Sequence, residues 1–243
     1  VPLPEKFETV GTCAFCSADK LASIDLGGTI SLGGSAFEST SAKAGVNFRP
    51  ELGRLTTIGD FAFSRTAQSS VSLPDSVTTV GEQAFSESTA LTSFHIGAGV
   101  TSFAETALYN DRKIATLTVV DGNPVYSAEH NVLYRKADDG LHLMLSPAAN
   151  TLTDYTVRAG TVEIGATAFA NNKTLTRVVL PEGLKVIGDD AFAGTTALTE
   201  LVIPESVERS SGVTGNSLEL VEYGSKVTSI RMEGSWVPMP RRI

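Results

Sequence analysis

The chain has 243 residues, with 27 acidic and 19 basic side chains and a formal net charge of -8. Because such a surface repels nucleic-acid phosphates and anionic lipids, neither is an expected partner. No apolar run is long enough to cross a bilayer, and the two cysteines are too few for a disulfide framework. Disulfide bonds are therefore not expected to hold this fold together.

A short phrase recurs along the chain: an aliphatic residue, Gly, two variable residues, Ala and Phe. Copies begin at Val10, Leu32, Ile58, Val80, Ile164 and Ile187. The starting positions lie 22, 26 and 22 residues apart among the first four copies, and 23 apart between the last two. A degraded copy begins at Phe103. Self-similarity at such a period predicts a solenoid, because one unit cannot bury its own apolar edge and must stack on the next.

Each phrase is followed by a small polar turn and then by a β-type segment. In residues 175–180 the apolar side chains occupy the first, fourth and sixth places, and Pro181 ends the strand because it has no N–H for the ladder. In the second unit Lys43 stands at the first of these places, as an imperfect match. We expect the segments to pair as parallel strands from unit to unit.

Two segments interrupt the period. Residues 121–150 are an insertion in which two apolar-rich runs flank Asp139-Gly140, a turn signal that predicts a β-hairpin. The polar stretch Glu205–Ser217 is rich in Ser and Gly and predicts a loop. We therefore expect one domain over residues 1–243, with a hairpin module at 121–150 and an atypical C-terminal cap and tail at 205–243.

With these residues identified, the chain resembles the BspA-like leucine-rich repeat proteins. The shared pattern is strand, Pro, aliphatic-x-x-aliphatic-Gly-x-x-Ala-Phe, small polar turn and Leu, and it runs from about Val10 to about Ile230. The resemblance implies a leucine-rich-repeat solenoid of the α/β-type horseshoe class, mostly β and turns. It would stack 22–26-residue units with parallel β-strands, interrupted by the inserted β-hairpin. The family's usual Cys or Asn in the turn after Phe is retained at Asn172 and replaced at Ala18, Thr66, Ser88 and Thr195.

The resemblance also implies a function class. Such proteins are chiefly secreted or surface-attached, bind other proteins or host surfaces, and share no catalytic motif. We therefore expect a non-catalytic, exported or cell-surface binding protein of the adhesion or host-interaction type, with its export signal outside the chain shown. A protein ligand is expected and a glycan is possible. The alternatives are a carbohydrate-binding accessory protein and a structural spacer that presents another domain.

Signatures of site chemistry are few. Cys13 and Cys16 form a C-x-x-C without the second ligand pair that zinc requires or the strand-to-helix setting of a redox site, so an ordinary structural role is expected. Neither a G-x-S-x-G elbow nor a phosphate-binding loop is present. His130 and His142 could approach each other, but two histidines are a weak metal signal. We expect no enzyme activity, no cofactor and no metal.

The residues on the expected outer face of the sheet are mostly small and often carry hydroxyl groups. This face is therefore a poor platform for sugars. More distinctive side chains are expected on the hairpin and at the C-terminal end of the sheet. The candidate ligand-binding residues are Tyr126, His130, Tyr134, His142, Arg177 and Glu200. For the tyrosines there is a competing interpretation, in which they pack the hairpin against the solenoid.

Overall fold

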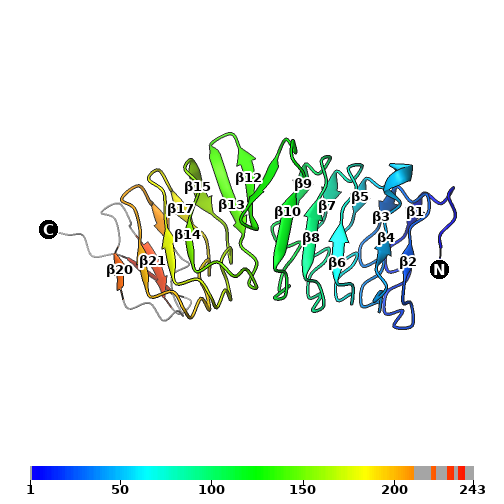
Figure 1. Ribbon diagram of the computed structural model, residues 1–243, viewed down its shortest axis with the longest axis horizontal. Helices are drawn as coiled ribbons and strands as arrows, with labels where there is room; N and C mark the ends of the chain where they lie inside the picture. Colours follow the sequence, from blue (N-terminus) through cyan, green and yellow to red (C-terminus); the bar gives the residue numbers. More distant parts are fainter. Residues whose placement is uncertain (1, 211–219, 223–228, 233–234, 239–243) are drawn as a thin grey trace. The chain divides into compact units, whose positions relative to one another are not determined.

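The computed structural model describes residues 2–210, 220–222, 229–232 and 235–238. The chain divides into two compact units, Val1–Ser127 and Ala128–Ile243. Each unit consists mainly of short parallel strands joined by turns (Figure 1), which confirms the predicted solenoid class. Within the described residues the only helical element is the 3-10 turn η1 (Pro50–Leu52), and no helix there could span a membrane. That residues 1–243 form a single solenoid stays a prediction.

In the N-terminal unit the coils contribute strands to two faces. The first face is a five-stranded parallel sheet of β1 (Thr9–Val10), β3 (Ser31–Leu32), β5 (Thr57–Ile58), β7 (Thr79–Val80) and β9 (Ser102–Phe103), in that order. The second face holds the pair β2 (Ile24–Asp25) and β4 (Val46–Asn47), and the three-stranded parallel sheet β6 (Ser70–Ser72), β8 (Ser93–Ile96) and β10 (Thr116–Val119). The first aliphatic residue of each repeated phrase lies in the first face, in register with its equivalent in the next coil.

The phenylalanines of the repeated phrase form a continuous stack inside this unit. The ring centroids of Phe15 and Phe37 lie 5.1 Å apart, those of Phe37 and Phe63 5.5 Å, and those of Phe63 and Phe85 5.3 Å. Neighbouring ring planes differ by 15° at most. Each coil returns its ring to the same place even where the spacing is 26 and not 22 residues, so the repeated phrase itself builds the core.

The Gly of the repeated phrase is required by the close approach of two coils. A Cβ built on Gly59 would lie 2.7 Å from the carbonyl oxygen of Leu32, and one on Gly188 would lie 2.6 Å from the backbone nitrogen of Ala166. A Cβ built on Gly11, in the first described coil, would have no neighbouring atom within 4 Å. The Gly of the phrase therefore lies where the backbones of successive coils come into contact.

The C-terminal unit has the same construction. One sheet contains β12 (Val132–Ala137), β13 (Gly140–Leu145), β15 (Thr161–Ile164), β17 (Val186–Ile187) and β19 (Arg209–Ser210). The second is a parallel sheet in the order β14 (Asp154–Thr156), β16 (Arg177–Val179), β18 (Glu200–Val202) and β20 (Leu220–Glu222). The strands β21 (Ser229–Met232) and β22 (Ser235–Pro238) form an antiparallel pair. The strand β11 (Tyr126–Glu129) contains the boundary between the two units.

The predicted hairpin is confirmed. The strands β12 and β13 pair antiparallel around the turn at Asp138 and Asp139, and β13 then pairs in parallel with β15. The insertion thus becomes part of a sheet of the C-terminal unit, and Val132, Tyr134 and Leu143 lie in its core.

Two details of the predicted frame are wrong. Ala42, and not Lys43, fills the first apolar place of the second unit, because the turn is one residue shorter there: Ala42 is fully buried and Lys43 is exposed. In the third unit, where the frame assigned no residue to this place, the buried Gln68 occupies it. The loop predicted at Glu205–Ser217 contains the strand β19, in which Ser210 pairs with Ile187 as the next anchor; residues 211–217 lie outside the described part.

Candidate functional site

The hairpin tyrosines are not exposed, which corrects the expectation that they could contact a ligand. Tyr126 is 3% exposed and Tyr134 is fully buried. The backbone N–H of Phe103 donates a hydrogen bond to the Tyr126 hydroxyl oxygen at 2.9 Å. Both rings pack in the core, as expected if the tyrosines pack the inserted segment against the solenoid and do not bind a ligand.

Tyr134 anchors a polar cluster in the C-terminal unit. Its hydroxyl lies 2.6 Å from that of Tyr155 and accepts the backbone N–H of Arg158 at 3.3 Å. The Arg158 guanidinium lies over the Tyr134 ring at 5.3 Å and pairs with Glu129 at 3.3 Å. Burial raises the pKa of both phenols, so both stay protonated and can donate as well as accept. This cluster ties the hairpin to the start of the next coil.

The two hairpin histidines lie in different surroundings. His130 is exposed in the turn before β12, and its carbonyl oxygen accepts a hydrogen bond from the Asn150 amide at 2.9 Å. His142 lies on β13, where its ring is 13% exposed between Asp139 at 2.9 Å and Glu163 at 3.5 Å. Because His142 pairs with Arg135, well along β12 from the turn that holds His130, the two rings share no site. Within the described part, no three His, Cys, Asp or Glu side chains are arranged to hold a metal ion.

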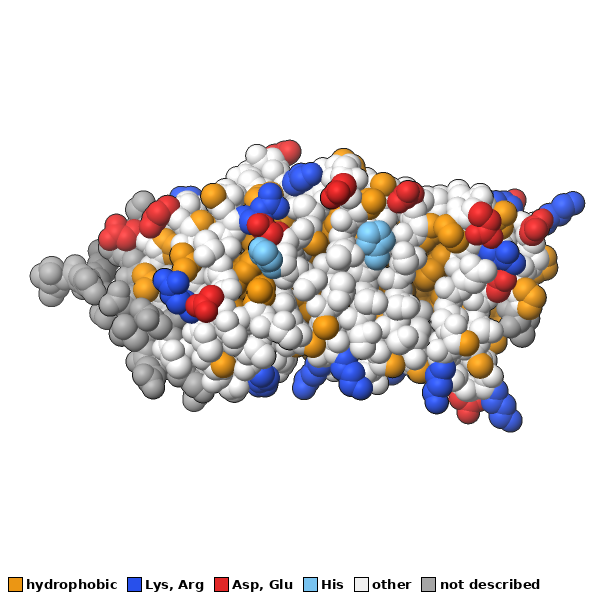
Figure 2. Space-filling model, in the orientation of Figure 1, with side chains coloured by type: hydrophobic (Ala, Val, Ile, Leu, Met, Phe, Trp, Pro, Cys, Tyr) orange, Lys and Arg blue, Asp and Glu red, His pale blue; other side chains and the backbone are white. Residues whose placement is uncertain are grey.

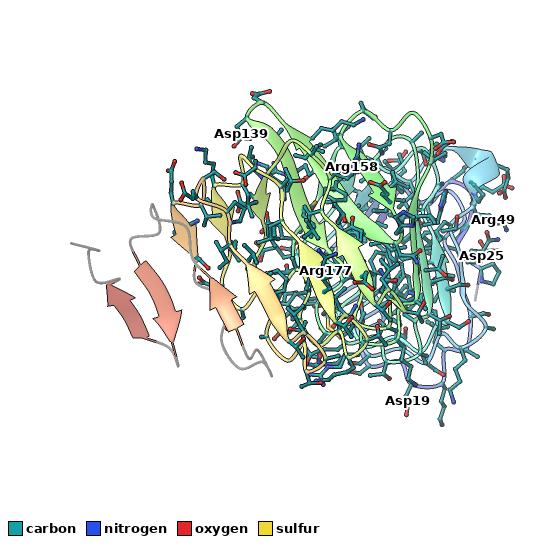
Figure 3. All side chains as sticks on the ribbon, turned by 60° about the vertical axis from the view of Figure 1, so that its left-hand side comes forward. Asp19, Asp25, Arg49, Asp139, Arg158 and Arg177 are labelled. Carbon is teal, nitrogen blue, oxygen red and sulfur yellow. A yellow bond between two sulfur atoms is a disulfide. The ribbon has the colours of Figure 1, made fainter. Side chains whose placement is uncertain are left out.

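Arg177 is exposed on β16, near the middle of the second sheet of the C-terminal unit (Figure 3). Its backbone register partners are Asp154 on β14 and Glu200 on β18, so one rung of the sheet carries acidic, basic and acidic residues in order. Arg177 and Glu200 therefore lie on neighbouring strands, and their role in ligand binding stays a prediction. The side chain of Glu200 lies outside the described part.

The next outward rung contains two valines, with Thr156 on one side and Glu222 on the other. Thr156 is in register with Val179 on β16, and Val202 on β18 is in register with Glu222 on β20. Val202 is 49% exposed, a large value for an aliphatic side chain. A shallow groove of about 180 Å³, here called the β16 groove, lies over these strands. It is lined by Arg177, Val178, Val179, Leu180, Glu182, Val202 and Pro204.

A wider and more open groove follows β14, the first strand of the same sheet. It encloses about 700 Å³ and is here called the β14 groove. Its lining residues are Glu129, His130, Leu152, Asp154, Tyr155, Thr156, Val157, Arg158 and Ala159. Two of the predicted site residues line these grooves in the C-terminal unit. Arg177 lines the β16 groove and His130 lines the β14 groove. The β14 groove also includes Arg158 and Glu129, which sequence reasoning missed because their pairing depends on the hairpin packing beside β14.

The second face of the N-terminal unit is different. Its outward residues on β6, β8 and β10 are mainly Ser and Thr, and His95 contacts the Thr118 hydroxyl at 2.8 Å. In the space-filling view the surface over these strands is mostly uncharged polar or backbone (Figure 2). It offers few groups that could distinguish one ligand from another.

One bidentate ion pair stands out in the N-terminal unit. Arg49 contacts the Asp25 carboxylate through Nε at 2.7 Å and through a terminal nitrogen at 2.8 Å, and the two side chains lie together in Figure 3. The Arg49 guanidinium holds the pKa of Asp25 below its ordinary value. Because both groups are satisfied by each other, this pair is a structural clamp between successive coils.

Comparison with known proteins supports the fold. Three solved bacterial structures superpose on the chain. A leucine-rich repeat protein from Eubacterium ventriosum is 24% identical with a TM-score of 0.75, over 93% of this chain and 63% of that one. The pneumococcal vaccine antigen PcpA is 19% identical with a TM-score of 0.68, over 93% of this chain and 71% of that one. A leucine-rich cell surface protein from Faecalibacterium prausnitzii is 19% identical with a TM-score of 0.55, over 94% of this chain and 83% of that one. The chain thus spans less than two thirds of the Eubacterium protein.

A search of curated proteins found no significant match. The sequence profile described as the BspA type leucine-rich repeat region matches residues 1–115, 56–134 and 148–233, with six copies. These ranges together cover most of the chain and include both units. The chain therefore belongs to the BspA-type leucine-rich repeat family.

Proposed function

We propose that this protein is a non-catalytic binding protein that recognises a protein ligand through the outer face of β14, β16 and β18. The observation that carries the proposal is the β16 groove, which is lined by the exposed Val202, the half-buried Val179 and Arg177. Arginine is enriched among the residues that contribute most to protein interfaces, and exposed aliphatic surface is stabilised when a partner covers it. It has no counterpart on the hydroxyl-rich face of the N-terminal unit.

The geometry favours an extended segment of a partner. The sheet face is shallow, and its outward side chains repeat with the period of a strand. A peptide lying across the strands therefore follows the charged rung and also covers the neighbouring rung that contains Val179 and Val202. A carboxylate in that segment would pair with Arg177, and a neighbouring aliphatic side chain would cover Val179 and Val202. Such a ligand is read by complementarity over several coils, as in other solenoids.

Export and display at a cell surface are part of the proposal. They are supported by the family and by the structural neighbours, one of which is described as a cell surface protein and another as a vaccine antigen. Protease accessibility on intact cells that express the protein would check this part. Complete protection of the protein on intact cells would contradict display.

A binding array of extracellular-matrix proteins, serum proteins and glycans tests the proposed site. We expect Arg177→Glu and Val202→Asp each to weaken binding of the protein hit by about tenfold or more, since both alter an interface anchor. The matched controls are Ser72→Asp and Thr116→Glu, which place charges on the outer face of the N-terminal unit. Equal losses in all four variants, or none in the first two, would contradict the proposed site.

The array also separates the alternatives. A carbohydrate-binding role would need exposed aromatic platforms, and Tyr126 and Tyr134 are both buried. A glycan hit that survives both C-terminal variants would therefore favour a site elsewhere on the molecule. A protein without any hit would favour the structural spacer.

A further inference from the structure

Cys13 and Cys16 form a disulfide within the first described copy of the repeated phrase. Their Cα atoms lie 4.8 Å apart, and the residues are the first and last of a four-residue turn closed by a hydrogen bond from the Cys16 N–H to the Cys13 carbonyl oxygen at 3.3 Å. Cys13 is exposed and Cys16 is half-buried. The only covalent cross-link in the described chain is thus local and reachable from solvent.

The same turn forms in five other copies that contain no cysteine. The residue equivalent to Cys13 has a φ near +55° in each of them, as Cys13 itself does. Each equivalent turn is closed by the same hydrogen bond, at 2.9 to 3.1 Å. The equivalent pairs are Ser35 and Glu38, Phe61 and Ser64, Gln83 and Ser86, Thr167 and Ala170, and Asp190 and Ala193. The backbone that brings the two sulfurs together is therefore a property of the repeat and does not depend on the disulfide.

Contacts with the next coil hold this turn in place. The backbone N–H groups of Cys13, Phe15 and Ser17 donate to the carbonyl oxygens of Gly34, Ala36 and Glu38 at 2.9, 2.8 and 2.7 Å. The Phe15 ring stacks on Phe37 with centroids 5.1 Å apart. None of these contacts involves sulfur, so they persist when the disulfide is opened.

We propose that Cys13 and Cys16 form a thiol-exchange site, which opens and closes in the folded protein while the coil keeps its structure. The thiolate of a small-molecule thiol attacks the exposed Cys13 sulfur, the S–S bond breaks, and Cys16 leaves as a thiolate. The product is a mixed disulfide at Cys13. A second thiol then attacks this mixed disulfide to release a small-molecule disulfide and leave both cysteines reduced, a two-electron reduction of the protein in all.

The reverse reactions restore the disulfide. The Cys16 thiolate attacks the mixed disulfide at Cys13 and expels the small-molecule thiol, and the preformed turn keeps the two sulfurs within reach. The site can therefore carry a small thiol, or a thiol of a partner protein, as a reversible modification near the N-terminal end of the repeat array. This property is independent of the proposed ligand-binding face.

The first experiment reduces the folded protein with millimolar glutathione or dithiothreitol, without denaturant, and follows the free thiols by alkylation and mass spectrometry. We expect reduction within about tenfold of the rate of a free peptide of residues 12–17, and a mixed glutathione adduct on Cys13. The circular dichroism spectrum should be unchanged and the melting temperature lowered by less than about 8 °C, because the closed loop is short. Reduction only in denaturant, or loss of the folded signal on reduction, would overturn the proposal.

A transplanted pair gives the matched control. In a Cys13→Ser/Cys16→Ser background, Ser35→Cys/Glu38→Cys places two thiols on the equivalent turn of the next coil. We expect this pair to oxidise with a small-molecule disulfide and to be reduced again in the folded state. If the transplanted pair stays reduced under conditions that close Cys13 and Cys16, the repeat turn is not what positions the sulfurs, and that result also counts against the proposal.

Discussion

Asp111 is a carboxylic acid inside the N-terminal unit. It stands in the turn position that holds Asn172 in a later copy and Thr66 and Ser88 in earlier ones. The Ser88 N–H donates to one carboxyl oxygen at 2.7 Å, and the other oxygen has no hydrogen-bond partner among the described residues. Burial raises the pKa of Asp111 from 3.8 to about 8, with the nearby charge of Glu87 as a further cause.

The raised pKa predicts a dependence of stability on pH. Because the folded-state pKa lies above the unfolded value, folding favours the protonated acid, and this stabilisation is lost as pH rises from near 3.8 through about 8. Asp111→Asn removes the charge, and an amide is already accommodated at the equivalent Asn172. We expect the variant to be more stable than the wild type by about 2 kcal/mol at pH 9, and the difference to shrink toward pH 5. Chemical denaturation at several pH values measures this, and parallel pH profiles would contradict it.

Gln68 is the second polar residue at an unusual place. It is fully buried where neighbouring units have an apolar side chain such as Leu91, and neither side-chain polar atom has a hydrogen-bond partner within the described residues. Gln68→Leu should raise the free energy of unfolding by about 1 to 2 kcal/mol, because it removes the cost of burying an unpaired amide. Gln68→Glu should lower it by a larger amount, and urea denaturation of both variants measures the difference. A destabilised Gln68→Leu would mean that the amide has a partner, such as bound water.

At the scale of the element, the repeated phrase is a strand end followed by a turn that rests on the coil before it. The Gly at its second place is needed only where such a coil exists. In the first described coil Gly11 has free space, whereas Gly59 touches the backbone near Leu32. The Gly of the motif is therefore required at position 59, where a side chain would clash with the preceding coil, but space does not require it at position 11.

The two glycines form a matched pair for mutagenesis. Gly59→Ala forces the coils apart or distorts them, and we expect it to lower the free energy of unfolding by roughly 2 to 4 kcal/mol. Gly11→Ala should change stability by less than about 0.5 kcal/mol, since no backbone lies near the added methyl group. Thermal unfolding of both proteins measures the contrast. Similar effects at the two sites would show that the corner needs Gly for backbone flexibility and not for space.

At the scale of the whole molecule, each coil contacts mainly its neighbours, and the contacts cluster into two units. Phe63 lies in the stack of the N-terminal unit, and Phe169 stacks on Phe192 in the C-terminal unit with centroids 5.1 Å apart. Stability in such arrays is close to a sum of local and nearest-neighbour contributions. Damage to one unit should therefore remain largely within it.

Hydrogen exchange with mass spectrometry tests this independence. Phe63→Ala should speed amide exchange in peptides from residues 24–103 and leave residues 155–203 near the wild-type rates, and Phe169→Ala should do the reverse. Each substitution removes about 3 to 5 kcal/mol of packing from its own stack. Uniform acceleration over both units by either variant would show that the chain unfolds as one cooperative body.

Several features of this protein could be predicted from the sequence. The repeat, its strands, its stacked phenylalanines and the hairpin at Asp139-Gly140 follow from local patterns, because each copy of the phrase carries the same turn and strand signals. The predicted assignment of inward positions was wrong at Lys43. The turn before it is one residue shorter than in other units, so Ala42 points inward in place of Lys43. The inward position of Gln68 was also missed, because the turn before it is shortened in the same way.

The candidate site was only partly accessible to sequence reasoning. Arg177 was found because its strand position places it on the outer face, and that position follows from alternation along a strand. The burial of Tyr126 and Tyr134, the pairing of Arg158 with Glu129 and the β14 groove depend on how the inserted segment packs on coils some twenty residues away. The β16 groove depends on the pairing of β16 with β18, one coil further along the chain. The sequence by itself determined the architecture, because a solenoid repeats one local solution. Only the tertiary structure decided which side chains remain exposed, because exposure depends on neighbours that are distant in the chain.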